Sequence, residues 1–478
     1  MEHLYDKLKQ NYASGNYPYH MPGHKRNMTG YPMEEYYGID ITEIDGFDNL
    51  HKPQEILKAV MERAGKLFGA ETYLLINGST GGILSGISAA VEKGETLLMA
   101  RNCHKAAYHA AYLRECRIEY CYPDFIESCG ICGAVSLETI KKKLEENPDI
   151  KAVFLTSPTY DGVVSDVESI VREAHKRQIP VIVDEAHGAH FCLDERFPRS
   201  AVDCGADLVI HSIHKTLPAF TQTALLHVQG ELIDRRKLRR FLQIYQTSSP
   251  SYILMAGIEQ CISILEKEKT TLCDKFFEQN KMFEKNIKNL QYIKILSKES
   301  APDQMYDFDT GKKVISVRGT GMTGQALYEL LLEKYGLQME MAGQDYVTAI
   351  MTIMDSAEGY LRLAEALLET EKDVLQSGTQ ERNVFPYAER KTPPERVYRI
   401  SEAWEMEMDK VALEECEGEI SAEFVHIYPP GIPLIVPGER FTKAIVEQLL
   451  RYRRQGLTIE GLHEDNKRAG IIREETYA

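Results

Sequence analysis

Short apolar runs alternate with amphipathic segments along the middle of the chain, from residue 71 to residue 227. A run of four to eight apolar residues is typical of a strand buried on both faces, whereas apolar residues three and four positions apart are typical of a helix that packs on a sheet. This alternation favours a parallel sheet covered by helices, an α/β fold. The predicted strands are residues 72–77, 96–100, 151–157, 180–186, 206–212 and 223–228, and the predicted helices are residues 81–93, 104–113 and 167–178.

The flanking segments follow different patterns. Residues 1–50 are rich in Tyr, Gly, Pro and Asp without a strong period, so we expect an extended N-terminal arm. Helical spacing from residue 251 to about residue 296 predicts a long helix or a helix pair. Beyond it, strand-like and helical runs predict a smaller α+β domain. The expected division is therefore an arm at 1–50, a large domain at 51–295 and a small domain at 296–478.

The composition of this 478-residue chain argues against several partners. Asp and Glu total 72 and Lys and Arg total 56, which gives a formal net charge of −16. Nucleic acids and anionic membrane surfaces attract basic proteins, so we expect neither as a partner. No apolar run approaches the ~20 residues of a membrane-spanning helix, and the N-terminus lacks a signal-peptide pattern. We therefore expect a cytoplasmic protein.

Ten cysteines are spread along the chain without the dense spacing of a disulfide framework, as expected in a reducing compartment. Four of them, Cys116, Cys121, Cys129 and Cys132, could be interpreted as a zinc knuckle. The first pair has four intervening residues within a predicted strand, and no other feature indicates a metal. We therefore assign no metal site.

The turn after the first predicted strand has the character of an anion site. It holds Gly78, Ser79 and Thr80 and leads into a helix, so small residues leave backbone N–H groups open to an anion. The patterns G-x-G-x-x-G and G-x-x-x-x-G-K-[ST] are both absent, which argues against a dinucleotide site and a P-loop. A plain strand-to-helix turn is the alternative.

The predicted strand at 180–186 brings a carboxylate, Asp184, to its end, and burial of a carboxylate is costly without a cationic partner. The letters DEAH at this point suggest a helicase, but the phosphate loop that a helicase needs is missing. His187 and His190 could bind a metal. Because no third ligand is specified, surface or packing roles are favoured for both histidines.

Two further residues follow predicted strands. Lys215 comes after the strand at 206–212, and lysine is rarely buried without a partner. His104 comes after the strand at 96–100, where helix capping is the alternative. A lysine, a carboxylate, a stacking ring and an anion turn at the ends of one sheet are what pyridoxal 5′-phosphate requires, since it bonds to a lysine and has a ring nitrogen and a phosphate.

The order of these residues resembles that of fold-type I, aspartate-aminotransferase-like enzymes. Within this group the chain is similar to the ornithine/lysine/arginine decarboxylase family, and the resemblance spans nearly the whole chain. The implied fold is a large domain that binds pyridoxal phosphate, followed by a smaller C-terminal α+β domain. The matching motifs include HMPGHK at 20–25, RNCHK at 101–105, VDEAHGAHF at 183–191, SIHKTLPAF at 212–220 and YPPGIPLIVPGE at 428–439.

The HMPGHK element arrives by residue 20, so the chain resembles the shorter members of the family, which lack the N-terminal wing domain. The resemblance implies a homodimer in which each active site is built from both chains. His24 of the arm would then reach the active site of the neighbouring subunit.

The resemblance also implies roles for the strand-end residues. Lys215 would hold the cofactor covalently, Asp184 would keep its ring nitrogen protonated, and His104 would stack on its ring. His214 or Lys215 would deliver the proton that replaces the lost carboxylate. The other expected cofactor contacts are Gly78, Ser79, Thr80, His187, Ser212, His214 and Ser249, the last reaching across the dimer interface unless it only caps a helix.

The implied reaction is decarboxylation of a basic amino acid to an amine that feeds polyamine synthesis. The net charge and two acidic residues, Asp161 and Glu439, favour a cationic substrate, with arginine ahead of lysine and ornithine. Turn capping is the alternative for Asp161, and the net charge could serve solubility alone.

Two other classes of function remain open from the sequence. One is an aminotransferase or lyase of the same fold, and the other is a non-catalytic regulator that kept the fold. The presence of Lys215, Asp184 and His104 together argues against the regulator, because a binding protein has little use for all three.

Overall fold

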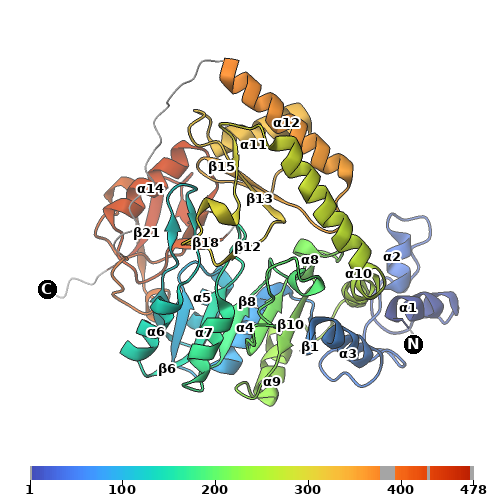
Figure 1. The fold of residues 1–478 in the computed structure, drawn as a ribbon. Coiled ribbons are helices and arrows are strands. Elements are labelled where there is room, and N and C mark those ends of the chain that lie inside the picture. The colour runs from blue at the N-terminus through green and yellow to red at the C-terminus, as the bar shows by residue number, and fades with distance from the viewer. Residues whose placement is uncertain (1–2, 377–392, 428–430, 474–478) are drawn as a thin grey trace. The chain divides into compact units, whose positions relative to one another are not determined.

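The computed structural model describes residues 3–376, 393–427 and 431–473 of the chain. Two compact units are present, each assembled from separate stretches of sequence (Figure 1). The predicted domain boundaries after residues 50 and 295 follow chain order and stay a prediction. The first unit comprises Met1–Ala90, Ala152–Ser157 and Val167–Asp274, and the second comprises Val91–Lys151, Pro158–Asp166 and Lys275–Ala478.

Five neighbouring strands form the sheet of the first unit, in the order β1-β10-β9-β8-β6. β6, β8 and β9 are parallel, as predicted. β10 is antiparallel to both of its neighbours, so the sheet is mostly rather than wholly parallel. The connection from β9 to β10 contains only a one-turn helix, α8, and not the longer helix that usually returns a chain to the start of a parallel strand.

Every strand and helix predicted between residues 71 and 228 is present, with ends that differ by a few residues at most. The strands of the first unit are β1 (Glu71–Leu75), β6 (Ile150–Thr156), β8 (Val181–Asp184), β9 (Leu208–His211) and β10 (Ala224–Val228). Its helices are α1 (Leu4–Ala13), α2 (Glu34–Ile39), α3 (Ile56–Phe68), α4 (Gly78–Ala90), α7 (Val167–His175), α8 (Ile213–Thr216) and α9 (Arg235–Tyr245), with most of α10 (Tyr252–Ile287).

Helix α4 lies unusually close to the sheet. A Cβ atom on Gly82 would lie 2.6 Å from Leu75 Cδ1 and 3.1 Å from Ile210 Cγ2, so any side chain there would push the helix away. The glycine therefore keeps the N-terminus of α4 next to the carboxyl end of β1, where the sequence predicts an anion site.

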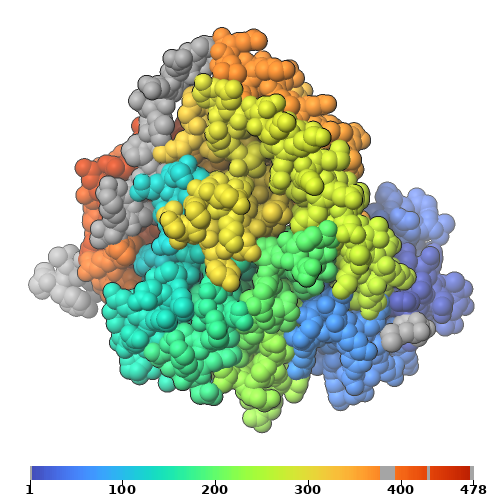
Figure 2. All heavy atoms as spheres, viewed as in Figure 1, coloured from blue at the N-terminus to red at the C-terminus, as the bar shows by residue number. Residues whose placement is uncertain are grey.

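The N-terminal fifty residues are partly helical, so the expectation of an extended segment is wrong for α1 and α2. Leu4 and Leu8, one turn apart in α1, are fully buried. Two apolar anchors are too few to establish a period in the sequence. His3 and Arg63 both hydrogen-bond to Glu259 of α10, and Figure 2 shows the blue N-terminal segments against the yellow-green α10.

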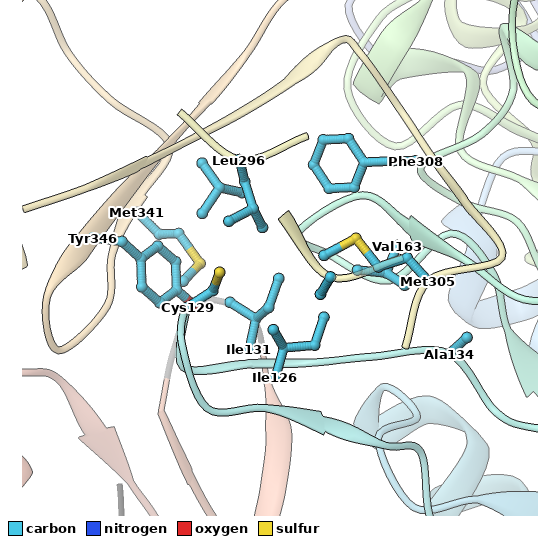
Figure 3. Packing of buried hydrophobic residues seen from close by; sticks show 12 residues of the cluster. Ile126, Cys129, Ile131, Ala134, Val163, Leu296, Met305, Phe308, Met341 and Tyr346 are labelled. Carbon is cyan, nitrogen blue, oxygen red and sulfur yellow. The ribbon is translucent and has the colours of Figure 1, made fainter. Parts of the chain in front are cut away.

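The second unit combines the parallel pair β2–β3 with antiparallel sheets from the later part of the chain. The sheet β11-β13-β15-β14 and its helix α11 confirm the predicted α+β character. A buried cluster packs Leu296, Met341 and Tyr346 with Ile126 and Ile131 of the β4–β5 hairpin (Figure 3).

The strands of this unit are β2 (Thr96–Ala100), β3 (Arg117–Cys121), β4 (Phe125–Ile126), β5 (Ile131–Cys132), β7 (Val163–Val164), β11 (Lys294–Ile295), β12 (Asp307–Phe308), β13 (Lys312–Ser316), β14 (Met341–Ala342), β15 (Tyr346–Ile350), β16 (Met408–Ala412), β17 (Val425–Ile427), β18 (Ile432–Ile435), β19 (Ile459–Glu460), β20 (Leu462–His463) and β21 (Arg468–Ile472). Its helices are α5 (Lys105–Leu113), α6 (Leu137–Glu146), α11 (Gly324–Tyr335), α12 (Ala357–Gln376), α13 (Ile400–Ala403) and α14 (Lys443–Arg454).

Candidate active site

Asp184 and Lys215 lie at the ends of two neighbouring parallel strands of the first unit. Asp184 is the last residue of β8 and is in register with Ile210 of β9. Lys215 lies in α8, which starts two residues after the end of β9. All residues of both strands are buried, so two apolar strands bring these polar groups to one edge of the sheet, as the sequence predicts.

The carboxylate of Asp184 is buried with little compensation for its charge. Its side chain is 4% exposed, and the backbone N–H of Ala186 donates to Oδ1 at 3.1 Å. Burial raises the pKa of this carboxyl, although the charge of Lys215 and the hydrogen bond from Ala186 oppose the shift. A cationic nitrogen beside Asp184 would offset the cost of burying the anion.

Lys215 has a partner that the sequence does not reveal. Its Nζ lies 3.0 Å from Nε2 of His187, three residues after Asp184 in the chain. A lysine nitrogen can donate to an unprotonated ring nitrogen, so this hydrogen bond orients the lysine. The segment after β8 therefore carries both the buried carboxylate and the ring that positions the lysine.

The predicted anion turn joins the same edge of the sheet. Gly78 begins α4 with a φ of +69°, a left-handed conformation that favours glycine. Ser79 Oγ lies 2.6 Å from Ser212 Oγ, which precedes α8. The first turn of a helix presents N–H groups without acceptors inside the helix, and Thr80 in this turn is exposed. These groups could hold an anion beside the lysine segment.

His214, next to Lys215, has a fixed tautomer. Its Nδ1 lies 2.7 Å from the carbonyl oxygen of Thr223, so Nδ1 carries a proton and donates it. Burial lowers the pKa of His214, and the charge of Lys215 adds to this effect, while the bond to Thr223 opposes it. In the neutral ring Nε2 is then an acceptor, so His214 is a poor source of a proton.

His104 lies in the second unit, at the start of α5. Its Nδ1 accepts a hydrogen bond from the backbone N–H of Ala106 at 3.2 Å, so it caps the helix, which was the alternative weighed from the sequence. This cap also fixes the ring orientation and leaves any proton of the neutral ring on Nε2.

Asp161 and Glu439, the two acidic residues expected near the substrate, also lie in the second unit. Burial raises the pKa of Asp161 to about 6, although a hydrogen bond from Tyr346 and the charge of Lys312 oppose the shift. Glu439 is 1% exposed, and its Oε2 accepts from Arg101 at 2.9 Å. Arg101 therefore pairs with Glu439 Oε2 within the unit, a partner that no local sequence pattern indicates, while Oε1 is buried without a hydrogen-bond partner among the described residues.

His24 and Ser249 lie in the first unit, outside these strand ends. His24 Nε2 is 3.3 Å from Asp40 Oδ2, and its Nδ1 accepts from the backbone N–H of Arg26 at 3.0 Å. Ser249 is exposed in the connection from α9 to α10, where its N–H donates to Thr247 Oγ1 at 3.2 Å. Their expected roles concern a second subunit and stay predictions.

None of the ten cysteines forms a disulfide bond in the part of the chain that the structure describes. Within residues 3–376, 393–427 and 431–473, no group of three or more His, Cys, Asp or Glu side chains is placed to hold a metal ion. No helix in the same ranges is both long and apolar enough to cross a membrane.

Comparison with known proteins finds two matching family models and several similar proteins. Residues 2–344 match the family model described as the major domain of Orn/Lys/Arg decarboxylase, and residues 382–472 match the model of its C-terminal domain. An uncharacterized protein of Bacillus subtilis, YaaO, is 34% identical over 467 residues, which cover 94% of this chain and 93% of that protein.

An arginine decarboxylase of Bacillus subtilis is 30% identical over 471 residues, which cover 96% of this chain and 95% of that protein. Among solved structures, the lysine decarboxylase LdcF of Francisella novicida has a TM-score of 0.83 at 20% identity, with 98% of this chain and 81% of that chain covered. At this identity the structural likeness supports the fold alone.

Proposed function

This chain belongs to the Orn/Lys/Arg decarboxylase family, and from that premise we propose that it removes the α-carboxyl group of arginine in preference to lysine and ornithine. One observation carries the proposal. The buried Asp184 and the partly buried Lys215 lie at the ends of adjacent strands in one unit. Decarboxylation of a basic amino acid is the activity of the family. Arginine is favoured because the full-length relative at 30% identity bears the name arginine decarboxylase. Supply of an amine for polyamine synthesis is part of the proposal.

The groups at this edge of the sheet fit pyridoxal 5′-phosphate. A buried carboxylate with little compensating charge suits a protonated ring nitrogen, and Asp184 provides one. The start of α4 and the hydroxyls of Ser79 and Ser212 suit a phosphate, since both are hydrogen-bond donors near a helix N-terminus. Lys215, oriented by His187, suits the covalent bond to the cofactor.

The chemistry supplied by pyridoxal phosphate when bound is withdrawal of the electron pair released as the bond to the α-carboxylate breaks. Asp184 would hold the proton on the ring nitrogen, and its burial strengthens that interaction because the local dielectric is low. Lys215 Nζ would return a proton to the α-carbon. His214 is disfavoured for this step because its Nδ1–H is committed to Thr223 and burial lowers its pKa.

His104 is proposed to stack on the ring and Asp161 to face the cationic end of the substrate. Glu439 is also a proposed substrate contact, through Oε1, which is buried without a hydrogen-bond partner in the described part of the chain while Arg101 binds Oε2. We also propose a homodimer in which His24 and Ser249 serve the neighbouring subunit's site.

Borohydride reduction of the purified protein followed by peptide mapping tests the lysine assignment, because reduction fixes the cofactor to the residue that carries it. The label is expected on Lys215, and a label on another lysine contradicts the assignment. Release of carbon dioxide from a panel of amino acids tests the reaction. A higher kcat/KM for lysine or ornithine than for arginine refutes the ranking, and formation of a keto acid instead of carbon dioxide refutes decarboxylation.

A further inference from the structure

A chain of buried hydrogen bonds crosses four strand segments of the first unit, next to the residues assigned to the cofactor. Glu185 Oε2 lies 2.7 Å from His211 Nε2, and His211 Nδ1 lies 3.0 Å from His227 Nε2. His227 Nδ1 lies 2.8 Å from Thr72 Oγ1. None of the four side chains is more than 4% exposed.

Strand register explains why these side chains meet. β1 pairs Thr72 directly with His227 of β10, and β10 pairs Leu225 with His211 of β9. His211 and His227 are therefore diagonal neighbours two positions apart, with side chains on the same face of the sheet. The ring of Phe68 covers both histidines, with ring centroids 5.5 Å from His211 and 4.9 Å from His227.

The position of the Thr72 hydroxyl proton sets the direction of the other hydrogen bonds in the chain. In the network that we infer, Thr72 donates its hydroxyl proton to the carbonyl oxygen of Ala70 at 3.0 Å, and its oxygen accepts from His227 Nδ1–H. A neutral His227 then has a bare Nε2, which must accept from His211 Nδ1–H. A neutral His211 likewise has a bare Nε2, and the donor that remains for it is a protonated Glu185.

The other side of Glu185 is compatible with a carboxylic acid. Ser200 Oγ donates to Oε2 at 2.6 Å, and the backbone N–H of Ala201 donates to Oε1 at 2.8 Å. The hydroxyl oxygen of an acid can accept from Ser200 while it donates to His211, and its carbonyl oxygen can accept from Ala201. All polar atoms of a neutral Glu185 are thus satisfied.

An ionised Glu185 would place a carboxylate in this buried space, beside an imidazolium if His211 were also charged, or beside a neutral His211 in the opposite tautomer. Burial raises the pKa of Glu185 to about 8 and lowers the pKa of His211 to about 3, so burial disfavours both charges. The pKa of His227 is lowered well below its usual range for the same reason. The other titratable groups that face Glu185 are His190, Asp203, Cys192 and Cys204.

We propose that Glu185 is a neutral carboxylic acid and a positioning residue, which ties together the strand ends that carry Asp184 and Lys215. Glu185 follows Asp184 directly, and its partner His211 precedes Lys215 by four residues. The bond between them is a cross-link between the two segments, and the chain to Thr72 extends it to β10 and β1. The positioning role rests on the proposed function, whereas the protonation state of Glu185 does not.

Ionisation of Glu185 has a defined consequence for its neighbours. Once the proton is lost, His211 must donate from Nε2 to the carboxylate, and His227 must donate from Nε2 to His211. Thr72 must then donate to His227 and release the carbonyl oxygen of Ala70. Removal of one proton therefore reverses three hydrogen bonds and breaks a fourth.

Nitrogen-15 NMR of the histidine-labelled protein tests the protonation state directly, since ring nitrogen shifts distinguish the two neutral tautomers from the imidazolium. His211→Gln and His227→Gln assign the signals. At pH 7 both rings are expected to be neutral and protonated on Nδ1. An imidazolium signal from His211, or an Nε2–H tautomer for either ring, overturns the proposal.

A matched pair of substitutions provides a second test. Glu185→Gln replaces the acid by an amide that can still donate to His211 and accept from Ala201, so the melting temperature is expected to stay close to that of the unaltered protein. Glu259→Gln is the control, because Glu259 is also buried but is bound by Arg63. This control is expected to lower the melting temperature. An equal or larger loss for Glu185→Gln contradicts a neutral acid.

The pH dependence of unfolding tests the protonation state of Glu185, because a side chain with a purely structural role would not change this dependence. Between about pH 5.5 and 7, above the pKa of a glutamate in the unfolded chain and below the folded value of about 8, the folded protein is expected to hold one more proton at Glu185 than the unfolded chain. The unfolding constant of the unaltered protein, divided by that of Glu185→Gln, should therefore rise tenfold per pH unit in this window. A constant ratio contradicts the proposal.

Retention of the cofactor tests positioning. Glu185→Ala leaves Asp184 and Lys215 in place but opens the cross-link, and it should weaken the hold on added pyridoxal phosphate by roughly tenfold, while Glu185→Gln retains it. If the alanine variant does not fold, His227→Gln breaks the chain farther from the site and serves instead. Equal retention in all variants overturns the positioning role. A protein that binds no pyridoxal phosphate even when unaltered refutes the proposed function instead.

Discussion

Two regions of the first unit bury carboxylates in opposite surroundings. At the end of β8, burial raises the pKa values of both Asp184 and Glu185; the charge of Lys215 opposes the shift at Asp184 without reversing it. On α10, burial also pushes the pKa of Glu259 upward, but hydrogen bonds from His3 and Arg63 outweigh burial, and the pKa is lowered. Burial alone therefore does not decide whether a carboxylate carries charge; the fixed cation beside it does.

The two sites differ in whether the protein itself supplies a hydrogen-bonded cation for the buried carboxylate. The carboxylate of Glu259 is fully buried and is satisfied by groups of its own unit, including Arg63 at 2.6 Å. It fastens the N-terminal segment and α3 to α10. At the strand ends the charge of Lys215 does not outweigh the burial of Asp184, which fits an incoming ring nitrogen at Asp184 and a retained proton at Glu185.

The largest expected effect follows from Asp184→Asn. The amide removes a poorly compensated buried charge, so the melting temperature is expected to stay the same or rise. Turnover is expected to fall by roughly a thousandfold or more, because each ~1.4 kcal/mol of lost stabilisation of the developing carbanion costs tenfold in rate. Carbon dioxide release and thermal unfolding, measured on the same preparation, check both parts. Near-normal turnover would remove Asp184 from the proposed mechanism.

Glu259→Gln is expected to act in the opposite way, on stability rather than on chemistry. It removes the buried negative charge beside Arg63 Nη1, which leaves the half-exposed Glu266 as the carboxylate that binds Arg63, and breaking one side of a buried ion pair costs about 3 kcal/mol. Urea unfolding measures the loss, and turnover per folded molecule is expected to remain. A loss of turnover in the fully folded variant would mean that the two regions are not functionally separate.

The dependence of stability on pH also distinguishes Glu259 from Glu185. The pKa of Glu259 is lowered on folding, so its contribution to stability is present above the unfolded value and is lost as pH falls through the folded value. The contribution of Glu185 has the opposite sign, because its raised pKa means that stability is lost as pH rises toward about 8. Glu259→Gln should therefore flatten the acid limb of the stability profile below about pH 4.5. An unchanged acid limb would show that Glu259 is not the ionised member of the comparison.

One half of this contrast, the strand ends that carry Asp184 and Lys215, is predictable from the sequence; the surroundings of Glu259 are not. The apolar runs predict β8 and β9, and Asp184 and Lys215 follow because strand ends are fixed by where the apolar run stops. The family resemblance and its reaction are supported by the family match. Local patterns were sufficient for these features because each depends on residues close together in the chain.

Features that depend on pairing between distant residues were not accessible. The contact of His187 with Lys215 and the pairing of Arg101 with Glu439 join residues 28 and 338 positions apart. The direction of β10 depends on how the chain leaves α8, and the hydrogen-bonded histidines depend on the register that follows from it. A histidine inside an apolar strand, such as His227, was the one available signal of the buried chain.

The smallest expected effect belongs to Glu266, the second carboxylate that binds Arg63. Arg63 Nη2 donates to its Oε2 at 2.6 Å, but the Glu266 side chain is 38% exposed, so water competes for the interaction. Glu266→Gln should cost about 0.5 kcal/mol, as is usual for a solvent-accessible pair, and added salt should shrink the difference further. Urea unfolding at low and high salt, alongside Glu259→Gln, measures both variants under the same conditions. If Glu266→Gln costs as much as Glu259→Gln, then exposure does not set the strength of these pairs, and the distinction between a complete buried site and its solvent-facing edge fails.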